Sequence, residues 1–181
     1  MDYIGRIRSL DANDLVQLWE QVGSGAKVPD WPPGKAFEHL VLRAFQVEGA
    51  EVVWPFQVKR EGEVIEEIDG AVYVDGMAFL VESKDYQNAV DVAPIAKMRS
   101  KLLRRPAGVM GVVFSCRSSF TDAATLLAGY MMPQAILLWQ GGELNVALRE
   151  GRMLAGLRAK FRWAVEQGFP DYNLMTEGDR R

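Results

Sequence analysis

Cysteine and histidine are almost absent from this chain: its 181 residues contain one of each, Cys116 and His39. A single cysteine cannot form an intramolecular disulfide, which excludes a disulfide-stapled scaffold and suits a reducing compartment such as the cytoplasm. One cysteine and one histidine are also too few for an ordinary structural zinc site. Any metal chemistry therefore has to rest on oxygen ligands.

Long hydrophobic runs are missing as well. No apolar stretch reaches the ~20 residues that a membrane-spanning helix requires, and the first residues lack the pattern of a secretion signal. We therefore expect no membrane association. The length predicts one domain with short extensions, which is large enough to hold a core without cross-links.

The chain has no large excess of one charge, because 21 lysines and arginines face 24 aspartates and glutamates. This balance does not by itself indicate a nucleic-acid partner. The charges are nevertheless sorted along the sequence: residues 48–69 hold seven acids and two basic residues, whereas residues 97–105 hold five basic residues and no acid. An anionic partner would have to meet one of the basic segments.

Apolar periodicity and turn residues predict an alternating series of helices and strands. The predicted helices cover residues 11–22, 35–47, 91–105, 119–128 and 153–165, and the predicted strands cover residues 51–58, 64–74, 77–84, 109–114 and 135–139. A hairpin followed by β-α-β crossovers predicts an α/β fold with a central mixed β-sheet of about five strands, flanked by helices.

The hairpin register places acidic residues opposite one another. A two-residue turn at Asp75-Gly76 predicts that Asp69 lies opposite Glu82 and that Glu67 lies opposite Lys84. Like charges directly opposite each other destabilise a strand pair by roughly 0.2–1 kcal/mol. Two interpretations are open: Lys84 neutralises these acids on a solvated face, or the carboxylates hold a divalent cation.

A further acid lies on the predicted helix at residues 35–47. At ~100° per residue, Glu38 falls inside the apolar arc of this helix, whereas His39 and Arg43 fall on the opposite, polar face. An acid on a buried helix face is rarely left without a partner. The alternative is that Glu38 lies at the edge of the arc and serves the first turn of its helix.

The pattern of Asp69, a gap of twelve residues and then Glu82-Ser83-Lys84 resembles the D…(D/E)-x-K signature of the PD-(D/E)xK nucleases. The helix that carries Glu38 agrees with the helix that precedes the strands of that fold. Residues 35–150 are similar to the Mrr-like restriction endonucleases, on the Val-Val-Phe-Ser segment at 112–115, the Ser-Phe-Thr-Asp-Ala-Ala segment at 119–124 and the last predicted strand. Ile68 stands where many of these nucleases have proline, and the glycine-rich lead-in of the Mrr-like enzymes is absent.

This resemblance implies a metal-dependent DNA endonuclease of a restriction-modification system. It implies that Asp69, Glu82 and the carbonyl of Ser83 bind Mg²⁺ or Mn²⁺, with Glu38 as an outer ligand. It also implies that Lys84 positions or activates the attacking water. The catalytic candidates are thus Asp69, Glu82, Lys84 and Glu38.

The DNA has to meet positive charge, and the predicted helix after the motif supplies a basic stripe. A solvated face is the common explanation of such a stripe, but the absence of any acid among these residues favours phosphate contacts. The candidate DNA-contacting residues are Lys97, Lys101, Arg104, Arg105, Gln87 and Arg43.

The chain divides into an N-terminal helical extension and linker (1–34), a nuclease-like domain (35–150) and a C-terminal helix and tail (151–181). A homodimer is expected by analogy, because cutting two strands takes two sites. The last predicted helix could supply the dimer interface or could cap the sheet. No separate specificity domain fits in the chain, so selectivity is expected from a separate specificity or defence protein.

Two other functions remain open at this point. One is a structure-selective nuclease, such as a repair nuclease or a Holliday-junction resolvase. The other is a DNA-binding or assembly module that keeps the nuclease fold without cleaving. Nicking of plasmid DNA separates cleavage from binding, and branched substrates separate the two kinds of nuclease.

Overall fold

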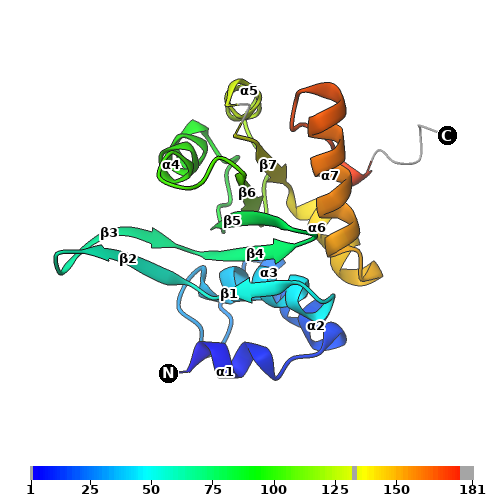
Figure 1. Cartoon of the computed structure of the whole chain (residues 1–181). Helices are drawn as coiled ribbons and strands as arrows, with labels where there is room; N and C mark the ends of the chain where they lie inside the picture. Colours follow the sequence, from blue (N-terminus) through cyan, green and yellow to red (C-terminus); the bar gives the residue numbers. More distant parts are fainter. Residues whose placement is uncertain (1, 132–133, 176–181) are drawn as a thin grey trace.

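A five-stranded sheet lies at the centre of the computed structural model, which describes residues 2–131 and 134–175 (Figure 1). Its strands, in spatial order, are β1 (Glu51–Val53), β4 (Gly70–Val74), β5 (Met77–Lys84), β6 (Val109–Ser115) and β7 (Ile136–Trp139). The pairs β1–β4 and β4–β5 are antiparallel, and the pairs β5–β6 and β6–β7 are parallel. The predicted α/β class and mixed sheet are confirmed.

Helices cover both faces of this sheet (Figure 1). One face packs against α2 (Ala12–Gly23), α3 (Lys35–Val47), α6 (Gly141–Glu150) and α7 (Met153–Gln167), and α1 (Tyr3–Arg8) packs against α3. The other face packs against α4 (Val92–Leu102) and α5 (Asp122–Tyr130). The sheet thus separates two apolar cores.

Local capping explains where several helices begin. The Asp91 side chain accepts a hydrogen bond of 3.1 Å from the Ala93 N–H at the start of α4, as predicted for a cap. The cap of α5 is Thr121 rather than the expected Ser119, because the Thr121 hydroxyl accepts the Ala124 N–H at 3.1 Å. Helices α1 and α6 were not predicted from the sequence.

The predicted strand at residues 64–74 is broken in the structure into β3 (Glu63–Ile68) and β4. Gly70 follows the break with φ of +154°, and a Cβ there would lie 2.6 Å from the Leu42 side chain and 2.9 Å from the Val53 carbonyl. Only glycine fits this backbone. Strand β3 pairs with β2 (Phe56–Arg60) in a separate two-stranded arm that extends away from the main sheet (Figure 1).

This break changes the surroundings of the residues just before it. Glu67 lies opposite Gln57 and accepts a hydrogen bond of 3.2 Å from its amide, so the expectation that Glu67 faces Lys84 is wrong. Ile68 is buried in the same core as Ala71, although an unbroken strand would send these two side chains to opposite faces. The predicted strand at residues 51–58 is likewise divided into β1 and β2.

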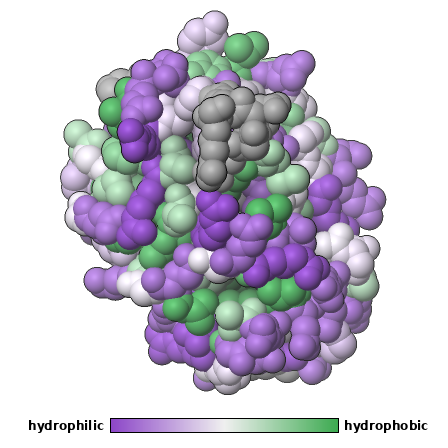
Figure 2. Space-filling model, turned by 90° about the vertical axis from the view of Figure 1, so that its right-hand side faces the viewer, coloured by the Kyte–Doolittle hydropathy of each residue, from purple (hydrophilic) through white to green (hydrophobic). Residues whose placement is uncertain are grey.

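Helix α7 is part of the core. Met153, Leu154 and Leu157 are buried, and the carboxylate of Glu48 accepts the N–H groups of Met153 and Leu154 at 2.7 and 2.8 Å. Helix α7 therefore caps the sheet, which is one of the two roles expected for it. The outer surface of this end of the molecule carries mainly hydrophilic residues with hydrophobic ones scattered among them (Figure 2). The homodimer stays a prediction.

No helix within the described parts of the chain is both long and apolar enough to cross a membrane. The longest described helix, α7, has 15 residues and contains basic and acidic side chains. The cytoplasmic location stays a prediction.

Candidate active site

The candidate site lies at the open end of the β4–β5 hairpin. The predicted register is confirmed, with Val74 opposite Met77 and Gly70 opposite Val81. Asp69 and Glu82 are the next residues beyond this ladder. The Ser83 N–H donates a hydrogen bond of 2.8 Å to Asp69 Oδ2, which holds the aspartate against β5.

Glu82 is the most deeply buried acid of this group, at 1% exposed, and lysines surround it. Lys84 Nζ lies 2.5 Å from Oε1, Lys101 Nζ lies 2.6 Å from Oε2, and Lys97 Nζ lies 3.8 Å from Oε1. Burial by itself would raise the pKa of Glu82, but the ammonium groups of Lys84 and Lys101 outweigh it and hold the pKa below its ordinary value. Glu82 is therefore a carboxylate at neutral pH.

The place of Lys101 corrects a prediction. We expected it on an exposed, DNA-facing stripe, but it is 2% exposed and its amine lies beneath Glu82. Lys101 follows the buried residues Ile95 and Met98 at intervals of three, so it belongs to the inward face of α4. The spacing that identified Glu38 as a buried acid would have identified Lys101 as a buried amine.

Asp69 is half-buried and has a different electrostatic balance. Burial and the nearby charge of Glu82 raise its pKa, whereas the hydrogen bond from Ser83 and the charges of Lys84 and Lys101 lower it, and the net direction is upward. The same neighbours act on Lys84. Burial would lower the pKa of Lys84, but Glu82 and Asp69 raise it above its ordinary value, so this amine is protonated.

Glu38 reaches the same neighbourhood from α3. It is 7% exposed, as the apolar arc predicts, and Lys35 Nζ binds its two carboxylate oxygens at 2.9 and 2.6 Å. Burial raises the pKa of Glu38, Lys35 opposes this, and the charges of Asp69 and Glu82 raise it further. Glu38 is thus electrostatically coupled to both other acids.

His39 does not lie on a polar face, contrary to the prediction. It is 4% exposed, and its ring lies 5.3 Å from that of Trp31 and 6.0 Å from that of Trp54. Its Nδ1 lies 2.9 Å from the Lys35 carbonyl oxygen. The ring of Tyr3, on the unpredicted helix α1, packs beside this histidine. It helps to cover the side of α3 that the sequence pattern predicted to be polar.

The other DNA-contacting candidates differ in side-chain exposure and in whether an acidic residue binds them. The Lys97 side chain is 60% exposed beside Glu82, and Gln87 is exposed in the loop after β5. Arg104 and Arg105 both bind Glu66, with Arg105 Nη2 2.5 Å from Oε2, so their charge is partly neutralised. Lys97 is the cation that is most accessible to a phosphate here.

Arg43 has a structural partner. Its Nε and Nη2 donate to the Leu10 carbonyl at 3.1 and 3.0 Å, and its Nη1 donates to Gln46 at 2.7 Å. The guanidinium therefore joins α3 to the segment between α1 and α2. Its DNA contact stays a prediction for which the structure provides no support.

The donor set allows a simple metal site. Within residues 2–131 and 134–175, no three His, Cys, Asp or Glu side chains gather closely enough to hold a metal ion. Glu38 thus does not complete a three-carboxylate metal cluster, and Lys35 binds it instead. Two carboxylates, Asp69 and Glu82, and the main-chain carbonyl of Ser83 remain, and Mg²⁺ usually takes one or two carboxylates with water and phosphate oxygens. Oxygen donors of this kind are those that Mg²⁺ and Mn²⁺ take, and in this structure both oxygens of Glu82 bind lysines.

Substituting Asp69 by asparagine should stabilise the protein at neutral pH. Because burial and Glu82 raise the pKa of Asp69 in the folded state, its ionisation favours unfolding. The stability associated with this group is complete below the ordinary aspartate pKa of about 3.9 and is lost as the pH rises through the folded-state value. Urea unfolding of Asp69→Asn and wild type from pH 4 to pH 8 should show a gap that widens with pH. A constant gap would contradict the assignment.

Comparison with known proteins supports one family. The sequence matches the restriction endonuclease model Mrr_cat over residues 32–148, which is more than half of the chain. No curated protein matches. Glu38, Asp69 and the segment 82–84 all lie within the matched region.

Several solved structures show a partial likeness to this chain. A repair endonuclease from Pyrococcus abyssi is 16% identical with a TM-score of 0.44, covering 62% of this chain and 49% of that one. The restriction endonuclease FokI bound to DNA is 14% identical with a TM-score of 0.47, covering 83% and 29% of the two chains. The restriction endonuclease MspJI in complex with a 27-mer oligonucleotide is 19% identical with a TM-score of 0.42, covering 92% and 38%.

This chain therefore spans about half or less of the length of those three solved chains. At these identities and TM-scores the likenesses add nothing to the family assignment. The assignment depends on the sequence match. It agrees with the geometry of the hairpin, which holds Asp69 beside Glu82 and Lys84. The chain belongs to the restriction endonuclease family described by the Mrr_cat model.

Proposed function

We propose that this protein is a metal-dependent DNA endonuclease that hydrolyses phosphodiester bonds, with an Mrr-like restriction role. The observation that supports this most is the cluster of Asp69, Glu82 and Lys84 at the open end of one hairpin, inside the region that matches the family. The expected products carry a 5′-phosphate and a 3′-hydroxyl, as the family resemblance implies.

Asp69, Glu82 and the Ser83 carbonyl would hold Mg²⁺ or Mn²⁺. Such an ion, when bound, polarises a phosphodiester oxygen and lowers the pKa of a bound water. The two carboxylates keep their relative position because the Ser83 N–H binds Asp69 and because Lys101 binds Glu82 from the buried side. Glu38 adds negative charge nearby, in contact with Lys35.

Lys84 is the more exposed of the two lysines that bind Glu82 most closely. Its side chain is 16% exposed, compared with 3% for Lys101, while both amines bind the same carboxylate. Negative charge develops on the phosphate oxygens during hydrolysis, and a fixed ammonium beside them stabilises that charge. Lys84 would also orient the attacking water, and the exposed Lys97 would contact a neighbouring phosphate.

Supercoiled plasmid tests the proposal. Wild-type protein with Mg²⁺ or Mn²⁺ should convert it to nicked and linear forms, and chelation by EDTA should stop the conversion. Asp69→Asn should lose this activity, because it replaces a carboxylate that would bind the metal by a neutral amide of similar shape, so that the fold is retained. Asp75→Asn is the matched control, because Asp75 lies at the exposed hairpin turn and binds Arg158 at 2.6 Å.

Persistent nicking by Asp69→Asn would refute the assignment of this site. DNA binding without nicking by wild type would favour the non-cleaving module. Faster cleavage of branched than of linear DNA would favour the structure-selective nuclease. The homodimer and a separate specificity or defence protein stay predictions.

A further inference from the structure

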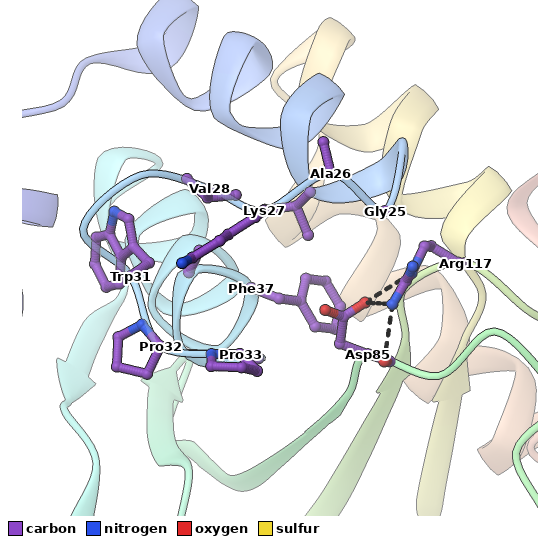
Figure 3. Close-up of a pocket in the computed structure, with 13 residues that line it drawn as sticks. Gly25, Ala26, Lys27, Val28, Trp31, Pro32, Pro33, Phe37, Asp85 and Arg117 are labelled. Atoms are coloured by element: carbon purple, nitrogen blue, oxygen red, sulfur yellow. Dashed lines mark hydrogen bonds and ion pairs between the residues drawn. The ribbon is translucent and has the colours of Figure 1, made fainter.

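A pocket of about 270 Å³ opens between the loop that joins α2 to α3 and the residues that follow β5 and β6 (Figure 3). One wall is the loop between α2 and α3, including Trp31 and the two prolines that follow it. The opposite wall consists of Asp85 and Arg117, and Phe37 forms part of the lining. Figure 3 shows the Trp31 and proline side on the left and the Asp85–Arg117 pair on the right.

The chain connects this pocket to the candidate site at three points. Asp85 directly follows Lys84, and Phe37 directly precedes Glu38. Arg117 follows β6 by two residues, and β6 ends with Ser115 paired to Lys84. Since β5 and β6 are parallel, their ends lie at the same edge of the sheet. Lys84 and the pocket therefore lie at the same edge of the sheet, where one DNA strand that runs along this edge could meet both.

An ion pair between Asp85 and Arg117 and one further cation line the pocket. Asp85 holds the Arg117 guanidinium through Nε at 2.9 Å from Oδ1 and through Nη2 at 3.1 Å from the Asp85 carbonyl oxygen. This arrangement directs Nη1 toward Gly25, where a Cβ would lie only 2.4 Å from it. Gly25 has φ of +74°, so the loop can approach the guanidinium closely.

The second cation is Lys27, which is exposed and lines the pocket. Among the described residues it makes no ion pair or hydrogen bond. In Figure 3 its side chain extends across the pocket from the loop, on the Trp31 side of the Asp85–Arg117 pair. An ammonium without a protein acceptor at the mouth of a partly apolar pocket is available to an anionic ligand.

The apolar wall is rigid. The Trp31 ring lies 5.2 Å from that of Tyr3 in a stacked arrangement, and the guanidinium of Arg6 lies 5.4 Å from the centre of the Trp31 ring. Trp31 is 5% exposed, and Pro32 and Pro33 follow it. The exposed faces of Pro32 and Pro33 suit the face of a nucleobase, and the exposed Lys27 suits its phosphate.

We propose that this pocket receives one unpaired base of the DNA strand that crosses the candidate site, with the adjoining phosphate held by Lys27. This inference rests on the proposed function, because it requires the strand to lie at Lys84. The loop between α2 and α3, in the N-terminal extension, would then take part in substrate selection. Duplexes with an easily unpaired base beside the cut would be preferred.

Photo-cross-linking tests the pocket without cleavage. The probe is a 12-mer oligodeoxynucleotide duplex with one mispaired 5-iododeoxyuridine, used in EDTA. Wild-type protein should cross-link through Trp31 or Phe37, as mapped by mass spectrometry of the peptide. Lys27→Glu should lower this yield about tenfold and Lys27→Arg should keep it. The charge-matched control is Lys59→Glu, at an exposed position on β2.

Cross-links that map only outside the pocket would overturn the inference. An equal loss of yield in Lys27→Glu and Lys59→Glu would also overturn it, because it would show a general effect of charge. Competition by free dTMP at the concentration of the probe would show that a free nucleotide, not a base within a strand, is the ligand, and would overturn it too.

The proposed function fails separately from this inference. Wild-type plasmid nicking without a pocket cross-link would overturn the pocket and retain the nuclease. A pocket cross-link without plasmid nicking would retain the pocket as a nucleotide site and overturn the nuclease.

Discussion

Lys84→Met is expected to slow plasmid nicking by about 10²–10³-fold, the usual effect of removing one fixed electrostatic stabiliser from an active site. Methionine keeps the length of the side chain but removes the ammonium that lies 2.5 Å from Glu82 Oε1. Glu82 keeps its contact with Lys101, so its position is retained. The measurement is the initial rate of loss of supercoiled plasmid at saturating protein and Mg²⁺.

Binding and cleavage should separate in this variant. Affinity for a duplex, measured in Ca²⁺ or EDTA, should fall only a few fold, because Lys84 is one cation among several near the DNA. Lys59→Met provides a matched control on the exposed arm and should cleave as wild type does. A Lys84→Met rate within tenfold of wild type would mean that another group stabilises the developing charge.

Lys101→Met is expected to lower the free energy of unfolding at pH 7 by about 3 kcal/mol. Removing one partner of a buried ion pair typically costs ~3–5 kcal/mol, because the remaining charge stays buried. The lower end applies here, since Lys84 still contacts the carboxylate of Glu82. Urea unfolding followed by circular dichroism measures this difference.

A double-mutant cycle isolates the pair. Glu82→Gln alone should destabilise the protein, because it leaves the amine of Lys101 buried beside a neutral group. The double variant Glu82→Gln with Lys101→Met should be more stable than the sum of the single effects predicts. The control is Lys97→Met, whose amine lies 3.8 Å from Glu82 on a 60% exposed side chain and whose loss should cost under ~0.5 kcal/mol. Equal costs for Lys101→Met and Lys97→Met would contradict the buried pair.

The hairpin that carries the site could be predicted because its cause is local. Asp75 and Gly76 both have positive φ, at 52° and 75°, as a two-residue turn with these side chains requires. The turn fixes the register, and the register brings Asp69 to the end of the ladder beside Glu82. The burial of Glu38 could likewise be predicted from the helical spacing of the apolar residues around it.

The features that could not be predicted depend on distant parts of the chain. The break before Gly70 follows from the close approach of Leu42 and the Val53 carbonyl, which no local pattern contains. The burial of His39 needs the rings that surround it, including Tyr3 from helix α1. Gly141 and Gly142 disfavour a helix by propensity, yet α6 begins there, and a Cβ on Gly141 would lie 1.9 Å from the Cys116 carbonyl.

The contact between Lys101 and Glu82 joins parts of the site that we expect to form at different stages of folding. The hairpin that brings Asp69 to Glu82 is a short-range structure, whereas the amine arrives only when α4 crosses over and β6 pairs in parallel with β5. Long-range parallel pairing is the slower kind of event, because a larger loop has to close first. We therefore expect the two acids to meet with Lys84 on the same hairpin before the amine of Lys101 reaches Glu82. A fragment that stops before α4 would hold the acids of the motif without the buried amine.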